Sequence, residues 1–226
     1  ADHPMRKVKQ ARVEDDHRVR YLSDDEEKRL RQALMDREGA AKTARESHRR
    51  WLTERGLEPV AAIGTEDYAD HIQPMVLLTI NTGLRRGEMF KLRRTDIDME
   101  KQQVKVRAAA AKSGKARHVP LNTEAFEAVT RWMRQHPGGP DDLIFPGKGG
   151  KPMTNIDSSW RTVSAAAKLN DFRWHDLRHH FASRLVMSGV DLNTVRELLG
   201  HADLKMTLRY AHLAPEHKAN AVAKLV

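Results

Sequence analysis

Residues 175–210 read HDLRHHFASRLVMSGVDLNTVRELLGHADLKMTLRY, and the fold is interpreted outward from them. The stretch holds a His and an Arg one helical turn apart, a His directly after a Leu-Gly pair, and a Tyr beside an Arg. Apolar residues recur between them at helical spacing, and Gly189 and Gly200 are predicted to separate the resulting helices. Secondary structure requires none of these polar side chains, whereas a phosphate under attack by a phenol would use all of them.

The whole chain is predicted to be mainly α-helical with one small three-stranded antiparallel β-sheet, an α+β fold. Ser23 and Glu26 have the spacing of a capping box and open the first helix, which is predicted to end near Gly39. Because Pro74 would lie inside the helix predicted over residues 65–83, that helix is expected to start near His71. The other helices are predicted near residues 44–52, 86–93, 123–136, 157–169, 175–188, 191–199, 204–212 and 216–225, and the strands at 96–99, 103–107 and 117–121.

The composition allows a normal core and limits the possible chemistry. Of the 226 residues 39% are hydrophobic and only 5% aromatic, so the core is expected to be mainly Leu, Ala, Val and Met. The absence of Cys excludes disulfides, a thiolate zinc site and a Cys nucleophile. No apolar run approaches the roughly 18 residues of a membrane span, and no signal peptide opens the sequence. We therefore expect a cytoplasmic protein.

The net charge of +9 suits a polyanion, of which a nucleic-acid backbone is the most common. Solubility alone would explain the charge equally well. Residues 1–22 are basic and have no helical or strand period, so they are interpreted as a basic arm or linker, or as a solvated tail.

His175 and Arg178 share one face of a predicted helix, where two donors can bind two oxygens of one phosphate. His175 and His179 also have the spacing of a zinc-binding helix pair, with Asp176 where a metalloprotease carries Glu. No third ligand at useful spacing is evident, and apolar residues make the same helix a core helix. We therefore predict no metal site, and neither His179 nor His180 is predicted to be a metal ligand. Surface histidines, or histidines satisfied by structural hydrogen bonds, are the alternative.

Two upstream cations could complete a phosphate site. Arg85 follows a Gly break that places it at a helix N-terminus, where backbone N–H groups favour an anion. Glu88 would orient this guanidinium or pair with it structurally. Lys112 lies in the loop between the second and third predicted strands, where a Lys is usually solvated but could donate a proton. Lys115 and Arg117 are rivals for that role.

His201 and Tyr210 lie at the C-terminal side of the predicted site. His201 follows Gly200 and therefore begins a new segment beside helix-start amides. A lone Tyr is more often a packed or interfacial residue, but Arg209 and His212 give Tyr210 polar neighbours.

Each element alone is a weak signal, but their order along the chain is specific. The sequence resembles the catalytic domain of the tyrosine recombinases, the phage-integrase family. That family combines Thr-Gly-Leu-Arg-x-x-Glu, a β-hairpin Lys, His-x-x-Arg, Leu-Gly-His and a Tyr. The matching residues, in order, are Arg85, Lys112, His175, Arg178, His201 and Tyr210.

The resemblance covers roughly residues 19–226, with few departures. Residues 36–66 look longer and less regular than the family would have between the first two helices. The family usually adds an N-terminal helical domain that binds the other face of the DNA, and nothing in this sequence resembles it. We therefore expect residues 23–226 to form the catalytic domain and residues 1–22 to be an inter-domain linker, with the core-binding domain absent from this chain.

The resemblance implies a transesterification at a DNA phosphodiester. Tyr210 would attack the phosphorus, form a 3′-phosphotyrosyl link and release a 5′-hydroxyl, with neither ATP, metal nor other cofactor required. Arg85 and Arg178 would hold the phosphate oxygens, and Lys112 would be the general acid toward the leaving oxygen. His175 would help to accept or position the tyrosine proton. A phosphate oxygen would receive a hydrogen bond from His201.

The resemblance also implies the partners. These are double-stranded DNA at specific attachment sites, a homo-tetramer on that DNA, and accessory DNA-bending proteins, while the isolated domain would be monomeric. The expected location is the bacterial nucleoid, and the expected process is integration or excision of a phage or genomic island. Residues 216–226 form an apolar C-terminal helix in this interpretation, and it would dock on a neighbouring protomer or on its own core.

Three alternatives stay open at the level of the sequence. A type IB topoisomerase shares this pocket but rejoins the same strand. A non-catalytic DNA-binding or accessory protein could keep the fold, although it would have no use for the phenol. A zinc hydrolase is the third alternative.

Overall fold

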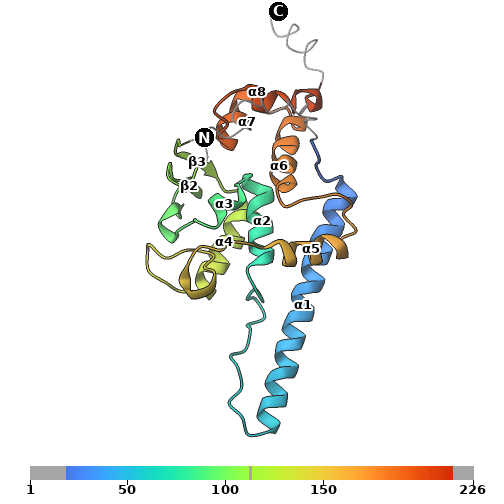
Figure 1. Cartoon of the computed structure of the whole chain (residues 1–226), viewed down its shortest axis with the longest axis vertical. Coiled ribbons are helices and arrows are strands. Elements are labelled where there is room, and N and C mark those ends of the chain that lie inside the picture. Colours follow the sequence, from blue (N-terminus) through green and yellow to red (C-terminus); the bar gives the residue numbers. More distant parts are fainter. Residues whose placement is uncertain (1–18, 112–113, 216–226) are drawn as a thin grey trace, which may run out of the picture.

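The computed structural model describes residues 19–111 and 114–215 and confirms the predicted fold class (Figure 1). Helices dominate, and one antiparallel sheet has the strand order β1-β2-β3. The α-helices are α1 (Asp24–Glu54), α2 (Ile72–Thr82), α3 (Arg86–Met89), α4 (Thr123–Gln135), α5 (Asp157–Ala166), α6 (Asp176–Met187), α7 (Leu192–Leu199) and α8 (Lys205–Leu208). The strands are β1 (Ile97–Asp98), β2 (Gln103–Val106) and β3 (Arg117–Pro120), and short 3-10 helices cover η2 (Arg94–Asp96), η3 (Lys148–Gly150) and η4 (Ala211–Leu213). Within residues 19–111 and 114–215, no helix is both long enough and apolar enough to cross a membrane.

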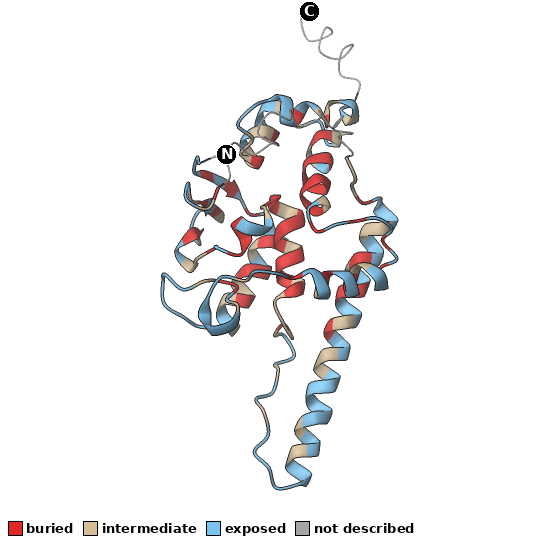
Figure 2. Cartoon of the chain, viewed as in Figure 1, coloured by how far each residue is buried: buried red, intermediate tan, exposed pale blue. Residues whose placement is uncertain are grey.

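Helix α2 lies at the centre of the core, where α4 and α6 pack against it. Most of its residues are buried, and Figure 2 shows it as the most continuously buried helix beside α6. The helix begins at Ile72, which confirms the predicted start near His71. Pro74 then falls in the first turn, where its missing N–H would have had no helical partner. The helix ends at Gly83, which has φ +63° and donates its N–H to the Thr79 carbonyl at 2.9 Å.

Helix α1 is much longer than predicted, so the expected end near Gly39 and the separate helix over residues 44–52 are wrong. A Gly ends a helix where it adopts a left-handed conformation, and Gly39 does not. Ion pairs one turn apart, such as Glu27 with Arg31 and Glu38 with Lys42, support the continuous helix. Beyond Gly39 the helix projects from the body, and no residue from 39 to 67 is buried (Figure 2). This projection explains why residues 36–66 are longer than the segment that the family would have between its first two helices.

The three strands lie where they were predicted, each shorter by one or two residues. Strands β2 and β3 pair with Val104 opposite Val119, and both side chains are buried in the core. Alternate positions of these strands are exposed, as expected for a sheet with one wet face. The loop between them carries Lys112, which lies outside the described residues.

The C-terminal helices form a separate small cluster above α2. Helix α7 begins where the Asp191 side chain accepts the N–H groups of Asn193 and Thr194, and it ends at Gly200 with φ +63°. The helix predicted over residues 204–212 is wrong in extent, because α8 ends at Leu208. The Tyr210 N–H bonds three residues back to Thr207, so a tight turn replaces the α-helix there. Helices α3 and α5 also end earlier than predicted, and the helix predicted over 216–225 lies outside the described residues.

Candidate active site

Arg85 is held at the start of α3 by Glu88. Its extended backbone follows the left-handed turn at Gly83, as the Gly break predicted. The Arg85 N–H donates to Glu88 Oε2 at 2.8 Å, and Arg85 Nη1 donates to Glu88 Oε1 at 2.9 Å. Glu88 therefore orients the guanidinium and also pairs with it structurally, so both predicted roles hold.

Arg117 approaches the same carboxylate from β3. Its Nη1 and Nη2 donate to Glu88 Oε1 and Oε2 at 2.9 and 2.8 Å, and its Nε donates to the Leu198 carbonyl at 2.8 Å. Both partners of the Arg117–Glu88 pair are buried. Burial alone would raise the pKa of Glu88, but the Arg117 guanidinium outweighs it and the pKa lies below its ordinary value. Arg117 is thus a fixed structural cation, which argues against it as a mobile proton donor.

Arg178 is the most deeply buried cation of the site, with 2% of its surface exposed. Its Nη1 donates to the Gly83 carbonyl at 2.6 Å and its Nη2 to the Leu199 carbonyl at 2.5 Å. These carbonyls fix the direction of the guanidinium without neutralising its charge. Burial, followed by the positive charge of Arg85, lowers the pKa of Arg178 to about 9, so it stays protonated at neutral pH.

His201 lies directly after the left-handed Gly200 that ends α7 and is half-buried. The next helix, α8, begins only at Lys205, so the structure does not place His201 at a helix start as predicted. Its Nδ1 lies 2.9 Å from Thr207 Oγ1. Burial first, and then the charges of Arg178 and Arg85, lower the pKa of His201 to about 3. The imidazole is therefore neutral at pH 7 and can donate one N–H to an anion.

Tyr210 is packed among these groups rather than exposed. Only 1% of its surface is accessible, and its hydroxyl lies 2.6 Å from Nδ1 of His179. Burial raises the pKa of the Tyr210 phenol to about 12. Burial first, and then the charges of His175, Arg209 and Arg178, together lower the pKa of His179 to about 4. The sequence pattern predicted no role for His179, and its contact with Tyr210 was therefore not predicted.

His175 stands at the N-terminus of α6 and is exposed. Its ring meets the His179 ring edge-on, with centroids 5.1 Å apart. It also lines a concavity of about 520 Å³ with Arg86, Arg173 and several other residues. Arg178 follows three residues later on α6, but it is buried whereas His175 is exposed.

Four of the six predicted residues influence one another electrostatically: Arg85, Arg178, His201 and Tyr210. His175 joins them through His179. Lys112 lies outside the described residues, and its rival Lys115 lines a concavity of about 210 Å³ beside His201. The structure thus brings two arginines, two neutral histidines and a phenol to one place. Such a group can hold an anion and present an oxygen nucleophile to it.

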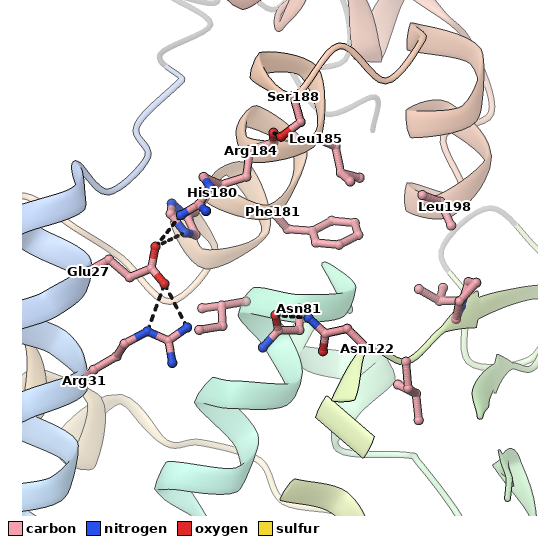
Figure 3. A pocket seen from close by; sticks show the side chains of 14 residues that line it. Glu27, Arg31, Asn81, Asn122, His180, Phe181, Arg184, Leu185, Ser188 and Leu198 are labelled. Atoms are coloured by element: carbon pink, nitrogen blue, oxygen red, sulfur yellow. Dashed lines mark hydrogen bonds and ion pairs between the residues drawn. The ribbon is translucent and has the colours of Figure 1, made fainter. Parts of the chain in front are cut away.

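A different cavity, of about 490 Å³, lies between α1, α2 and α6 (Figure 3). His180 lines it, accepting the Leu22 N–H at Nδ1 and placing Nε2 3.3 Å from Glu27. Glu27 also pairs with Arg31 and Arg184, so this cluster ties α6 to α1. None of the five predicted site residues that the structure describes lines this cavity. Across residues 19–111 and 114–215, no cluster of three or more His, Asp or Glu side chains is arranged to hold a metal ion.

Comparison with known proteins identifies relatives of this chain. The model of the phage integrase family matches residues 50–217. The tyrosine recombinase XerC of Xanthomonas campestris pv. campestris (strain B100) is 35% identical over 162 residues, which cover 70% of this chain and 48% of that protein. The integrase of Salmonella phage P22 is 31% identical over 177 residues, covering 72% of this chain and 45% of the integrase. The chain therefore spans about half the length of these curated relatives.

Solved structures share the fold. The crystal structure of XerA recombinase matches 91% of this chain and 64% of its own, with a TM-score of 0.60 and 23% identity. The Tn1549 transposon integrase in complex with circular intermediate DNA matches 68% of this chain and 59% of its own, with a TM-score of 0.54 and 26% identity.

Proposed function

Because the chain belongs to the phage integrase family of tyrosine recombinases, we propose that it cuts and rejoins DNA through a covalent 3′-phosphotyrosyl intermediate. The observation that carries this proposal is the assembly of Arg85, Arg178, His201 and Tyr210 around one position. These residues come from distant parts of the sequence, and packing alone does not require a buried guanidinium beside a buried phenol.

In the proposed reaction Tyr210 attacks the scissile phosphorus. The phosphorus–O5′ bond breaks as the tyrosine–phosphorus bond forms, so one phosphoester replaces another and no external energy source is needed. Negative charge gathers on the non-bridging oxygens. Arg85 and Arg178 are placed to stabilise it, because both are protonated cations oriented by neighbouring groups.

The remaining predicted residues have supporting roles in this proposal. His201 donates its N–H to a phosphate oxygen, which its neutral state allows. Lys112 protonates the leaving 5′-oxygen, supported by its place in the loop between β2 and β3. His175 is exposed at the start of α6, where it can help to position the phosphate or the tyrosine.

The proposed partner is double-stranded DNA at specific attachment sites, bound by a homo-tetramer with accessory DNA-bending proteins, at the bacterial nucleoid. The biological process we favour is integration or excision of a phage or genomic island. The support is that relatives include a phage integrase and a transposon integrase solved with DNA. The net charge of +9 also suits a DNA backbone.

Covalent capture tests this proposal. The 226-residue chain is mixed with a randomised pool of nicked duplexes, denatured, and the protein-linked DNA is recovered and sequenced. We expect the wild-type protein to become linked to a 3′ end in a sequence-specific manner. The Tyr210→Phe variant should lose all linkage while its DNA affinity stays within about two-fold, because the ring and its packing are kept.

Tyr68→Phe is the matched control, since Tyr68 is also buried but packs under Arg131 far from the site residues in sequence and contact. It should give wild-type linkage. A covalent adduct formed by Tyr210→Phe would overturn the assignment of the nucleophile. No adduct with any duplex in the pool would contradict the recombinase activity, and relaxation of supercoils without strand exchange would favour a topoisomerase.

A further inference from the structure

We propose that His179 is a further catalytic residue, which accepts the hydroxyl proton of Tyr210 as the phenol attacks DNA. The inference rests on the proposed function and assigns the proton acceptor to a side chain outside the family motif matched above. That motif provides His175 and Arg178, whereas His179 follows them on α6.

The geometry singles out His179. Its Nδ1 lies 2.6 Å from the Tyr210 hydroxyl, which is a short hydrogen bond. The two rings lie 5.8 Å apart between centroids and are inclined by 46°, and both residues are buried. The contact joins α6 to the tight turn after α8, residues 31 positions apart in the sequence. A contact with the reacting oxygen itself is what a general base requires.

The environment keeps His179 in the form that can accept a proton. Burial first, and then the positive electrostatic effects of His175 before α6, Arg209 beside Tyr210 and Arg178 on α6, together lower its pKa to about 4. The ring is therefore neutral at pH 7, and one nitrogen carries a free lone pair. With Nδ1 accepting from the phenol, the ring proton resides on Nε2.

Without DNA the proton stays on the phenol, whose pKa of about 12 lies far above that of His179. Tyr210 is then a buried, neutral and unreactive side chain. A phosphodiester held by Arg85 and Arg178 changes this balance, because its negative charge offsets the cations that disfavour an imidazolium. DNA binding thus makes His179 a better base at the moment the nucleophile is needed.

In the proposed step, each bond that forms is matched by one that breaks, and each proton has a donor and an acceptor. The Tyr210 oxygen bonds to phosphorus while its proton passes to Nδ1 of His179, which becomes an imidazolium. The phosphorus–O5′ bond breaks, and the 5′-oxygen takes a proton from the general acid, for which Lys112 is proposed. On rejoining, a DNA 5′-hydroxyl attacks phosphorus and gives its proton to the former general acid, which is now deprotonated. The phosphorus–tyrosine bond breaks, and the imidazolium returns its proton to the phenol oxygen.

Single-turnover adduct formation in His179→Gln tests the role. Gln can accept a hydrogen bond but cannot take up a proton, so packing is largely kept while base catalysis is lost. With a nicked duplex recovered by covalent capture, we expect unchanged DNA affinity and adduct formation slower by about 100- to 10,000-fold. Between pH 5 and 9 the wild-type rate should rise through the pKa of His179 in the DNA complex, and this rise should be absent in the variant.

His180→Gln is the matched control. It also removes a buried histidine from α6, but one that binds Leu22 and Glu27 in the cavity of Figure 3. Its rate, scaled to the folded fraction, and its pH profile should match the wild type. A further arm places 3-fluorotyrosine at position 210, since a more acidic phenol needs less help from a base. We expect it to recover part of the loss in His179→Gln.

Three outcomes would overturn the inference while leaving the proposed function intact. One is a wild-type rate and pH profile for His179→Gln. The second is an equal effect of 3-fluorotyrosine with and without His179. The third applies even if the variant does not fold: nitrogen NMR of the wild-type protein showing a proton on Nδ1 of His179. A wild-type protein that forms no adduct would instead contradict the proposed function itself.

Discussion

Glu88 and a pair of carbonyls orient the site's cations in different ways. Glu88 takes two hydrogen bonds from Arg117 and one from the side chain of Arg85, so its charge is shared between two guanidiniums. Arg178 is directed instead by the carbonyls of Gly83 and Leu199, which fix its plane but carry no full negative charge, and the attraction of Glu88 offsets its charge only in part. Arg178 should therefore contribute most of the electrostatic stabilisation of a bound phosphate, because the charge of a buried cation is weakly screened in a low-dielectric environment.

Arg178→Lys tests the importance of this fixed plane. A single ammonium keeps the charge but cannot reproduce the two-carbonyl fork, and a buried Lys loses its proton more readily than Arg. We expect adduct formation to fall by at least about 100-fold and the free energy of unfolding to fall by about 1–3 kcal/mol. Single-turnover capture and urea denaturation measure the two effects.

Arg184→Lys provides the comparison for that substitution, since Arg184 lies on the same helix, is half-exposed and pairs with Glu27. Its free energy of unfolding should change by less than about 0.5 kcal/mol. Equal capture rates for Arg178→Lys and the wild type would show that charge alone, without the planar fork, suffices.

The sequence predicted most side chains at the site because their local contexts are distinctive. Arg85 follows a Gly that ends α2, and His201 follows the Gly that ends α7, so both positions could be placed at helix boundaries. His179 could not be found in this way. Its partner Tyr210 is distant along the chain, and no spacing shows which face of α6 meets the turn after α8.

Two glycines at similar-looking positions have opposite structural roles in the helices. Gly39 lies inside α1 in a helical conformation, and a Cβ there would meet nothing within 4 Å. Gly83 has φ +63°, and a Cβ there would lie 2.5 Å from Cδ1 of Phe181. Each glycine is followed by residues that favour a helix, so the sequence alone did not show which of the two ends one. The end of α1 was predicted at the wrong residue for this reason.

Substitution by Ala should separate these roles. Gly39→Ala is expected to stabilise the protein by about 0.5–1 kcal/mol, because it reduces the backbone entropy lost in forming the helix. Gly83→Ala is expected to destabilise it by more than about 1 kcal/mol, because of the left-handed backbone and the clash with a core ring. Urea denaturation of both variants checks the signs, and a destabilised Gly39→Ala would contradict a continuous α1 in solution.

The elements were more predictable than their lengths. The strands and most helices lie where the spacing of apolar residues predicted them. An element that buries one face must carry apolar residues at its own structural period. The ends of α3 and α8 depended on tertiary packing instead. After α8 the chain tightens into a turn in which the Tyr210 N–H bonds to the Thr207 carbonyl, and Tyr210 contacts His179 of α6. No residue in the local sequence demands this turn.

Because two site histidines are buried or half-buried, the stability of the whole protein depends on pH. His179 and His201 are held neutral in the folded state, with pKa values of about 4 and 3 against 6.5 for an unburied imidazole. Between these values the unfolded chain binds more protons than the folded one. The contribution of the two histidines is therefore complete above pH 6.5 and declines as the pH falls toward 4 for His179 and toward 3 for His201. Glu27 continues the decline, because its pKa of about 2 against 4.5 removes stability between pH 4.5 and 2.

The free energy of unfolding should consequently decrease between pH 7 and pH 4.5. We expect a loss of about 1–3 kcal/mol over that window from the two histidines, after discounting for solvent screening at the half-buried His201. Urea titrations at several pH values measure it. His201→Gln should show a shallower loss because one of the two histidine proton-binding differences is removed, and its difference from the wild type should grow down to about pH 3, whereas the loss that Glu27 contributes below pH 4.5 should remain. A wild-type protein that gains stability between pH 7 and pH 4.5 would mean that these imidazoles are charged in the fold, and that neither could serve as the neutral partner the site requires.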